Sequence, residues 1–85
     1  MAVKTPSAVY TESLGSLTLK VATFTDLDDG DTWASGISGV KYWWHQRTDN
    51  PSTQASVGVA IAHSSETFTF YPAEDNAAIK LFVCV

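Results

Sequence analysis

Apolar residues alternate with polar or small residues along several short segments of the chain, and this period of two is its most constraining feature. Successive side chains of a β-strand point to opposite faces, so alternation predicts strands that are buried on one face. The pattern runs through residues 16–25, where Leu17, Leu19 and Val21 share a face, and through residues 40–47. No segment shows the sustained repeat of an amphipathic helix. The sequence therefore predicts an all-β fold.

The segments around Ser64-Ser65 form the clearest predicted hairpin. Val57, Val59 and Ile61 alternate with small residues, and Phe68 and Phe70 follow after the break. If Ser64-Ser65 is a two-residue loop, Ile61 lies opposite Phe68 and Val59 lies opposite Phe70, so all four share one face. Ser-Ser is not a preferred pair for the tight turns of hairpins, so a longer loop in the same register remains open.

Residues 79–85 are apolar on both faces, which is typical of a central strand covered on both sides. Residues 1–13 lack alternation and are predicted to form an extended N-terminal arm, either frayed or held by something else. Residues 14–85 are predicted to form a single β domain. Its expected architecture is a small five- to six-stranded antiparallel sandwich or barrel.

Composition narrows the possible partners and surroundings. The 85 residues are 45% hydrophobic, which favours one folded domain. A net charge of −4 with scattered basic residues disfavours nucleic-acid binding. The single cysteine, Cys84, excludes an intramolecular disulfide and is expected to be a buried, inert thiol. No apolar run approaches the length of a bilayer span, so we expect no membrane partner and folding in a reducing cytoplasm.

Four of the nine acidic residues fall within six positions and are candidate metal ligands. Carboxylates at alternating positions beside Gly30 could bind a hard cation such as calcium. However, Ile37 stands where an EF-hand has its bidentate glutamate, so that pattern fails. The favoured interpretation is a turn in which aspartates bond to backbone amides, without a metal or another cofactor. The four candidates are Asp26, Asp28, Asp29 and Asp31.

Catalytic motifs are missing from the sequence. His45 and His63 lack the paired spacing of a zinc site. His63 adjoins Ser64-Ser65, but the Gly-X-Ser-X-Gly pattern of a nucleophile elbow is not present. We therefore expect a protein that is not an enzyme.

The aromatic residues are the best candidates for partner contacts. Trp43 and Trp44 are adjacent in a predicted strand, so their side chains point to opposite faces and cannot form one platform. One is expected in the core, and the other is expected to be exposed, covered by the arm or in an interface. We expect interface contacts at Tyr10, Trp33 and Trp43. The alternative is a small glycan- or protein-binding module that uses an exposed Trp/Tyr face.

Several short motifs resemble small uncharacterised all-β proteins of tailed bacteriophages. The motifs are Asp29-Gly-Asp-Thr-Trp33, then Gly36-Ile37, then Thr67-Phe-Thr-Phe-Tyr-Pro72 and the apolar strand that ends the chain. The resemblance covers about residues 16–85.

The resemblance implies a virion-associated structural protein, either a head decoration (cement) protein or a small tail component, made in the host cytoplasm. It transfers no catalytic or binding residue. We expect a non-enzymatic subunit that binds copies of itself and other virion proteins through aromatic contacts and its N-terminal arm.

Overall fold

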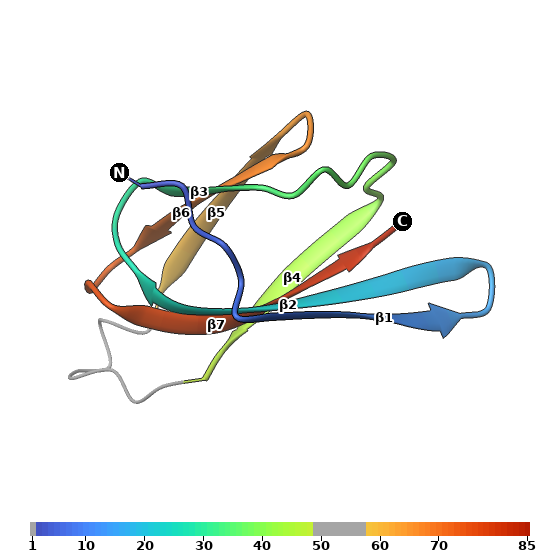
Figure 1. Ribbon diagram of the computed structural model, residues 1–85, viewed down its shortest axis with the longest axis horizontal. Helices are drawn as coiled ribbons and strands as arrows, with labels where there is room; N and C mark the ends of the chain where they lie inside the picture. Colours follow the sequence, from blue (N-terminus) through green and yellow to red (C-terminus); the bar gives the residue numbers. More distant parts are fainter. Residues whose placement is uncertain (1, 49–57) are drawn as a thin grey trace.

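The computed structural model describes residues 2–48 and 58–85, which form seven strands and no helix (Figure 1). Val57, which belongs to the predicted alternation, lies outside the described residues. The strands are β1 (Ala8–Leu14), β2 (Leu17–Leu27), β3 (Asp31–Ala34), β4 (Tyr42–Arg47), β5 (Val59–Ser64), β6 (Thr67–Pro72) and β7 (Ala77–Cys84).

The strands form two antiparallel sheets that pack as a sandwich. The four-stranded sheet has the order β1-β2-β7-β4, and the three-stranded sheet has the order β3-β6-β5. The chain passes from one sheet to the other between β2 and β3 (Figure 1). The prediction of an all-β antiparallel fold is confirmed. Of the two predicted architectures the structure has the sandwich rather than a closed barrel, with seven strands instead of the predicted five or six.

The core lies between the facing sides of the two sheets. On the four-stranded sheet, Ala22 pairs with Leu81 and Phe24 pairs with Ile79, so these apolar side chains share the inner face. The ring centroid of Phe24 lies 5.0 Å from that of Phe70 on the three-stranded sheet, which joins the two layers. The buried core residues are Ala22, Phe24, Leu27, Trp33, Val59, Phe68, Phe70, Ala77, Ile79, Leu81 and Val83.

The β5–β6 hairpin has a different register from the predicted one. Its loop is Ser65-Glu66, so Ile61 pairs with Phe70 and His63 pairs with Phe68. The predicted partners were therefore wrong by two residues, although the predicted residues do share the inner face. Ser65 has a φ of 55°, as the first central residue of a type II′ turn does. A shift of two residues preserves the face of every side chain, so alternation could not exclude it.

The extended arm predicted for residues 1–13 is not found. Residues 8–14 are the strand β1, which pairs with β2 along its whole length. All seven side chains of β1 are exposed, because the β1–β2 hairpin extends past the three-stranded sheet (Figure 1). A strand without a buried face has no need for apolar alternation, so the periodic pattern missed it. The sequence feature that indicates the β1–β2 hairpin is the Gly15-Ser16 pair in its loop, where Gly15 has a φ of 67°.

Candidate interaction surface

A row of large side chains crosses the side of the four-stranded sheet that faces away from the three-stranded sheet. Tyr10 pairs with Val21, Val21 pairs with Phe82, and Phe82 pairs with Trp44. Residues paired in this way lie on the same face of a sheet. The rings of Trp44 and Phe82 are stacked, with centroids 5.2 Å apart and an interplanar angle of 7°. Strands distant in the sequence thus contribute to one continuous apolar row.

The rows on either side extend this surface, which we call the outer face. Tyr42 and Cys84 pair with one another, and Cys84 also pairs with Leu19. Only Glu12 and Lys80 carry a charge among the residues that register places there. The outer face comprises Ala8, Tyr10, Glu12, Leu14, Leu17, Leu19, Val21, Thr23, Tyr42, Trp44, Gln46, Lys80, Phe82 and Cys84.

Large apolar side chains on the outer face remain open to solvent. Tyr10 and Trp44 are each 47% exposed, and Tyr42 is 62% exposed. Val21 and Cys84, on the same face, are buried. An antiparallel sheet with one solvated face usually carries polar residues on that face. The outer face departs from this rule, so it has the composition of a covered surface.

The outward side of the three-stranded sheet provides an internal comparison. Its residues are small or polar, with Tyr71 as the one aromatic among them. They are Thr32, Ala34, Ala60, Ala62, Ser64, Thr67, Thr69 and Tyr71. One molecule therefore presents one polar and one apolar sheet face.

The three aromatic residues predicted to make partner contacts lie in three different places. Trp33 is only 8% exposed and packs in the core against Phe24 and Phe68, so it is not a surface contact. Trp43 pairs with Val83 on the inner side of β4 and is 39% exposed. Tyr10 alone lies on the outer face.

Trp44 lies on the outer face but is not among the three residues predicted to make partner contacts. The alternation over residues 40–47 predicts that Trp44 and Tyr42 share a face, and the structure places both on the outer face. The alternation of Leu17, Leu19 and Val21 also belongs to this face rather than to the core. The strongest apolar alternation in β2 thus marked the surface that the second sheet does not cover.

The two histidines lie on the inner sides of their strands. The ring of His63 packs between Phe68, at a centroid distance of 4.5 Å, and Trp43, at 5.2 Å. Burial, together with the positive charge of Arg47, lowers the pKa of His45. Within residues 2–48 and 58–85, no three His, Cys, Asp or Glu side chains gather as metal ligands, and no pocket is found.

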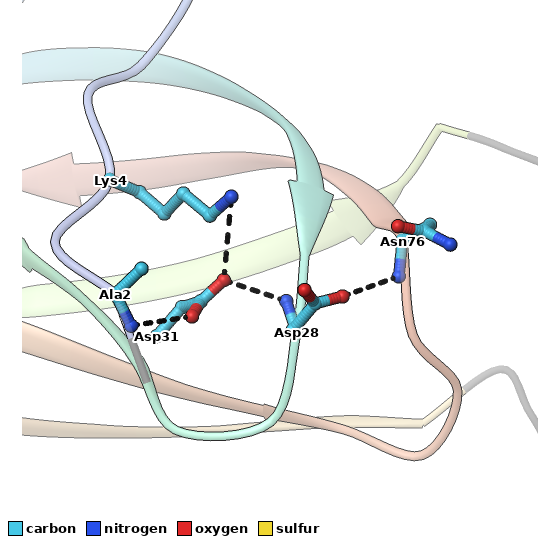
Figure 2. Close-up of polar contacts among 5 residues, drawn as sticks. All are labelled: Ala2, Lys4, Asp28, Asp31 and Asn76. Atoms are coloured by element: carbon cyan, nitrogen blue, oxygen red, sulfur yellow. Dashed lines mark hydrogen bonds and ion pairs between the residues drawn. The ribbon is translucent and has the colours of Figure 1, made fainter.

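The predicted acidic turn is organised around one buried carboxylate (Figure 2). Asp31 accepts hydrogen bonds from the backbone N–H of Ala2 at 2.9 Å and of Asp28 at 2.8 Å. The Lys4 Nζ lies 3.7 Å from the Asp31 Oδ2. Asp28 in turn accepts a 3.0 Å hydrogen bond from the backbone N–H of Asn76. These carboxylates thus hold backbone segments together, while Asp26 and Asp29 are exposed.

The charge of Asp31 is stabilised by this arrangement. Burial raises the pKa of the Asp31 carboxyl, since it disfavours the charged form. The hydrogen bonds from Asp28 and Ala2 and the charge of Lys4 act in the opposite direction. The net result is a pKa below the ordinary value of 3.8, so Asp31 is ionised at neutral pH.

Comparisons of the chain with protein-family models, curated proteins and solved structures gave no match. The described strands and connections include no helix that is long and apolar enough to cross a membrane.

Proposed function

We propose that this protein is a non-enzymatic structural subunit that assembles through its outer face. The observation that carries the proposal is the apolar row of Tyr10, Val21, Phe82 and Trp44, which spans four strands on the side away from the second sheet. In this row Tyr10 and Trp44 are each 47% exposed, whereas Val21 is buried. Contiguous exposed apolar surface is characteristic of protein–protein contact sites, and aromatic residues are enriched in them. Packing this row against another protein removes apolar surface from water and desolvates few polar groups.

The occupant we propose for the outer face is a second copy of the same chain. At a net charge of −4, two copies repel one another at long range. The outer face itself carries one acid, Glu12, and one base, Lys80, so packing two such faces brings no net like charge together. A neutral apolar face is complementary to another neutral apolar face. In an isologous dimer the outer face of each copy packs against the outer face of the other.

The size of the outer face limits the area that this association can bury. The outer face is four strands wide, with strands about 4.8 Å apart, and about seven residues long. Its projected area is therefore roughly 400 Å². Side chains make the accessible area larger than its projection, and standard interfaces bury about 800 Å² per partner. The outer face therefore supports a reversible homo-oligomer rather than a permanent one.

A virion is the setting we propose for this assembly. The resemblance of the Asp29–Trp33 and Thr67–Pro72 segments to small phage proteins supports a head decoration or tail component made in the host cytoplasm. In that setting the subunit contacts copies of itself and other virion proteins, and it needs no nucleic acid or cofactor.

Density-gradient fractionation of a source lysate, followed by peptide mass spectrometry, tests the setting. We expect the chain to sediment with particles of viral size, in a fixed ratio to a major shell protein. Recovery only in slowly sedimenting fractions would contradict the virion assignment.

A matched pair of tyrosine substitutions tests the surface. Tyr42 is 62% exposed on the outer face, and Tyr71 is 46% exposed on the polar face of the other sheet. We expect Tyr42→Lys to weaken self-association by about tenfold or more, because it places a desolvated charge inside an apolar contact. Tyr71→Lys should leave it unchanged. Sedimentation equilibrium over a concentration series measures both, and equal behaviour of the two variants would overturn the proposed surface.

A further inference from the structure

The N-terminal segment covers the free edge of β3. Val3 lies outside the seven strands and forms an isolated parallel β-bridge with Thr32. The backbone N–H of Thr32 donates to the Ala2 carbonyl at 2.8 Å, and the N–H of Lys4 donates to the Thr32 carbonyl at 2.6 Å. Residues 2–4 thus extend the three-stranded sheet by a short strand, in the manner of a peptide added to a sheet edge.

This segment is held by polar contacts rather than by packing. The Val3 side chain is 77% exposed, so it contributes almost no buried apolar area. The contacts of Ala2 and Lys4 are with Thr32 and Asp31. Beyond Pro6, the next anchored residue is Ser7, whose N–H donates to the Thr23 carbonyl in the other sheet. The polar contacts with Thr32 and Asp31 therefore supply nearly all of the stability of the docked segment, and residues 2–4 can leave the edge where equivalent contacts replace them.

The site on β3 is costly to leave empty. Asp31 is 1% exposed, and two of its three polar partners, Ala2 and Lys4, come from the N-terminal segment. A buried carboxylate that loses its hydrogen-bond and charge partners incurs a large desolvation penalty. Replacement of the segment by an equivalent one is therefore favoured over an empty edge.

We propose that the β3 edge, with Asp31 beneath it, accepts residues 2–4 from a second copy of the chain as well as from its own. In the exchanged state the same two backbone hydrogen bonds and the same Lys4–Asp31 ion pair form between copies, as in domain swapping. The chain's own segment occupies the edge in dilute solution, because its local concentration is high. Exchange becomes competitive where copies are held close together. This inference concerns a surface separate from the outer face and does not require it.

Disulfide trapping between two single-cysteine variants tests the exchange. Val3 and Thr32 are bridge partners, so V3C and T32C place two thiols within disulfide range when the segment is docked. The two variants are mixed at increasing concentrations under mild oxidation, and the V3C–T32C product is quantified by mass spectrometry. The double variant V3C/T32C first establishes the register, since it should close an intramolecular disulfide. Wild-type protein controls for Cys84, which is buried.

T69C is the matched control for T32C. Thr69 pairs with Thr32 on the adjacent strand β6 and lies on the same face, about 4.8 Å farther from Val3. We expect the mixture of V3C and T32C to give at least about tenfold more cross-linked dimer than that of V3C and T69C, because the added strand spacing exceeds disulfide reach. The yield should rise with protein concentration. Equal yields in the two mixtures would overturn the proposal, as would a double variant that closes while the mixture gives no V3C–T32C dimer.

Discussion

Asp31 shows how one residue can be both part of the core and part of a surface contact. Its side chain lies on the inner side of β3, opposite Phe70, yet it binds backbone groups of two separate segments. The buried charge is tolerated because each carboxylate oxygen has a hydrogen-bond donor. Removal of the charge should therefore loosen the N-terminal segment and the β2–β3 turn together.

The stabilising effect of Asp31 should depend on pH in a defined direction. The folded-state pKa of Asp31 lies below its ordinary value of 3.8, so the unfolded chain takes up this proton first as pH falls. The stabilisation is complete above about pH 5 and is lost as the pH falls through the folded-state pKa.

Asp31→Asn removes this titration and tests it. At neutral pH we expect the variant to lose about 1–3 kcal/mol of unfolding free energy, because the backbone donors lose a charged acceptor. Urea unfolding from pH 7 to pH 2.5 should show the difference from wild type narrowing in acid. A difference that stays constant throughout would contradict the assignment. Asp29→Asn, at an exposed position of the same turn, serves as the control.

At the scale of elements, the two hairpins differ in how their turns are made. The β1–β2 turn places Gly15 at its positive φ of 67°, which glycine adopts without strain. The β5–β6 turn places Ser65 at a φ of 55°, where the Cβ atom of an L-residue is crowded. The second hairpin therefore retains strain that the first avoids.

Ser65→Gly should relieve that strain. We expect a gain of about 0.5–1 kcal/mol in the free energy of unfolding, since left-handed backbone costs an L-residue about 1–2 kcal/mol and glycine gives back part of this in unfolded-chain entropy. Chemical denaturation measures the change. The control is Ser64→Gly, one residue earlier within β5, which should destabilise the protein. A loss of stability in Ser65→Gly would show that the serine side chain makes a compensating contact.

At the scale of the whole molecule, the two sheets leave two kinds of surface. The polar face of the three-stranded sheet is suited to water, and the outer face of the four-stranded sheet is suited to a partner. The β3 edge is a third surface, defined by backbone hydrogen bonds rather than by apolar area. The outer face and the β3 edge can each be disrupted separately, by Tyr42→Lys and by changes at residues 2–4.

The sequence by itself determined the fold class and the face on which most strand residues lie. Successive side chains of a strand point to opposite faces, so apolar alternation predicts both a strand and the face that its residues share. All-β structure and shared faces could therefore be predicted for residues such as Ile61, Phe68 and Phe70. The break between β2 and β3 was likewise visible from the aspartates and glycine of residues 26–31, although β2 runs to Leu27 and β3 begins at Asp31.

Only the tertiary structure decided which face of a strand meets the second sheet. Both faces of β2 and β7 carry apolar residues, and the face of β2 that meets the second sheet is that of Phe24 rather than that of Leu19. The hairpin register was also undetermined, because a shift of two residues keeps every side chain on its face. The docking of residues 2–4 on β3 depends on backbone groups and on a buried carboxylate distant in sequence. Local patterns carry no information about contacts of that kind, because they form only when remote segments are brought together.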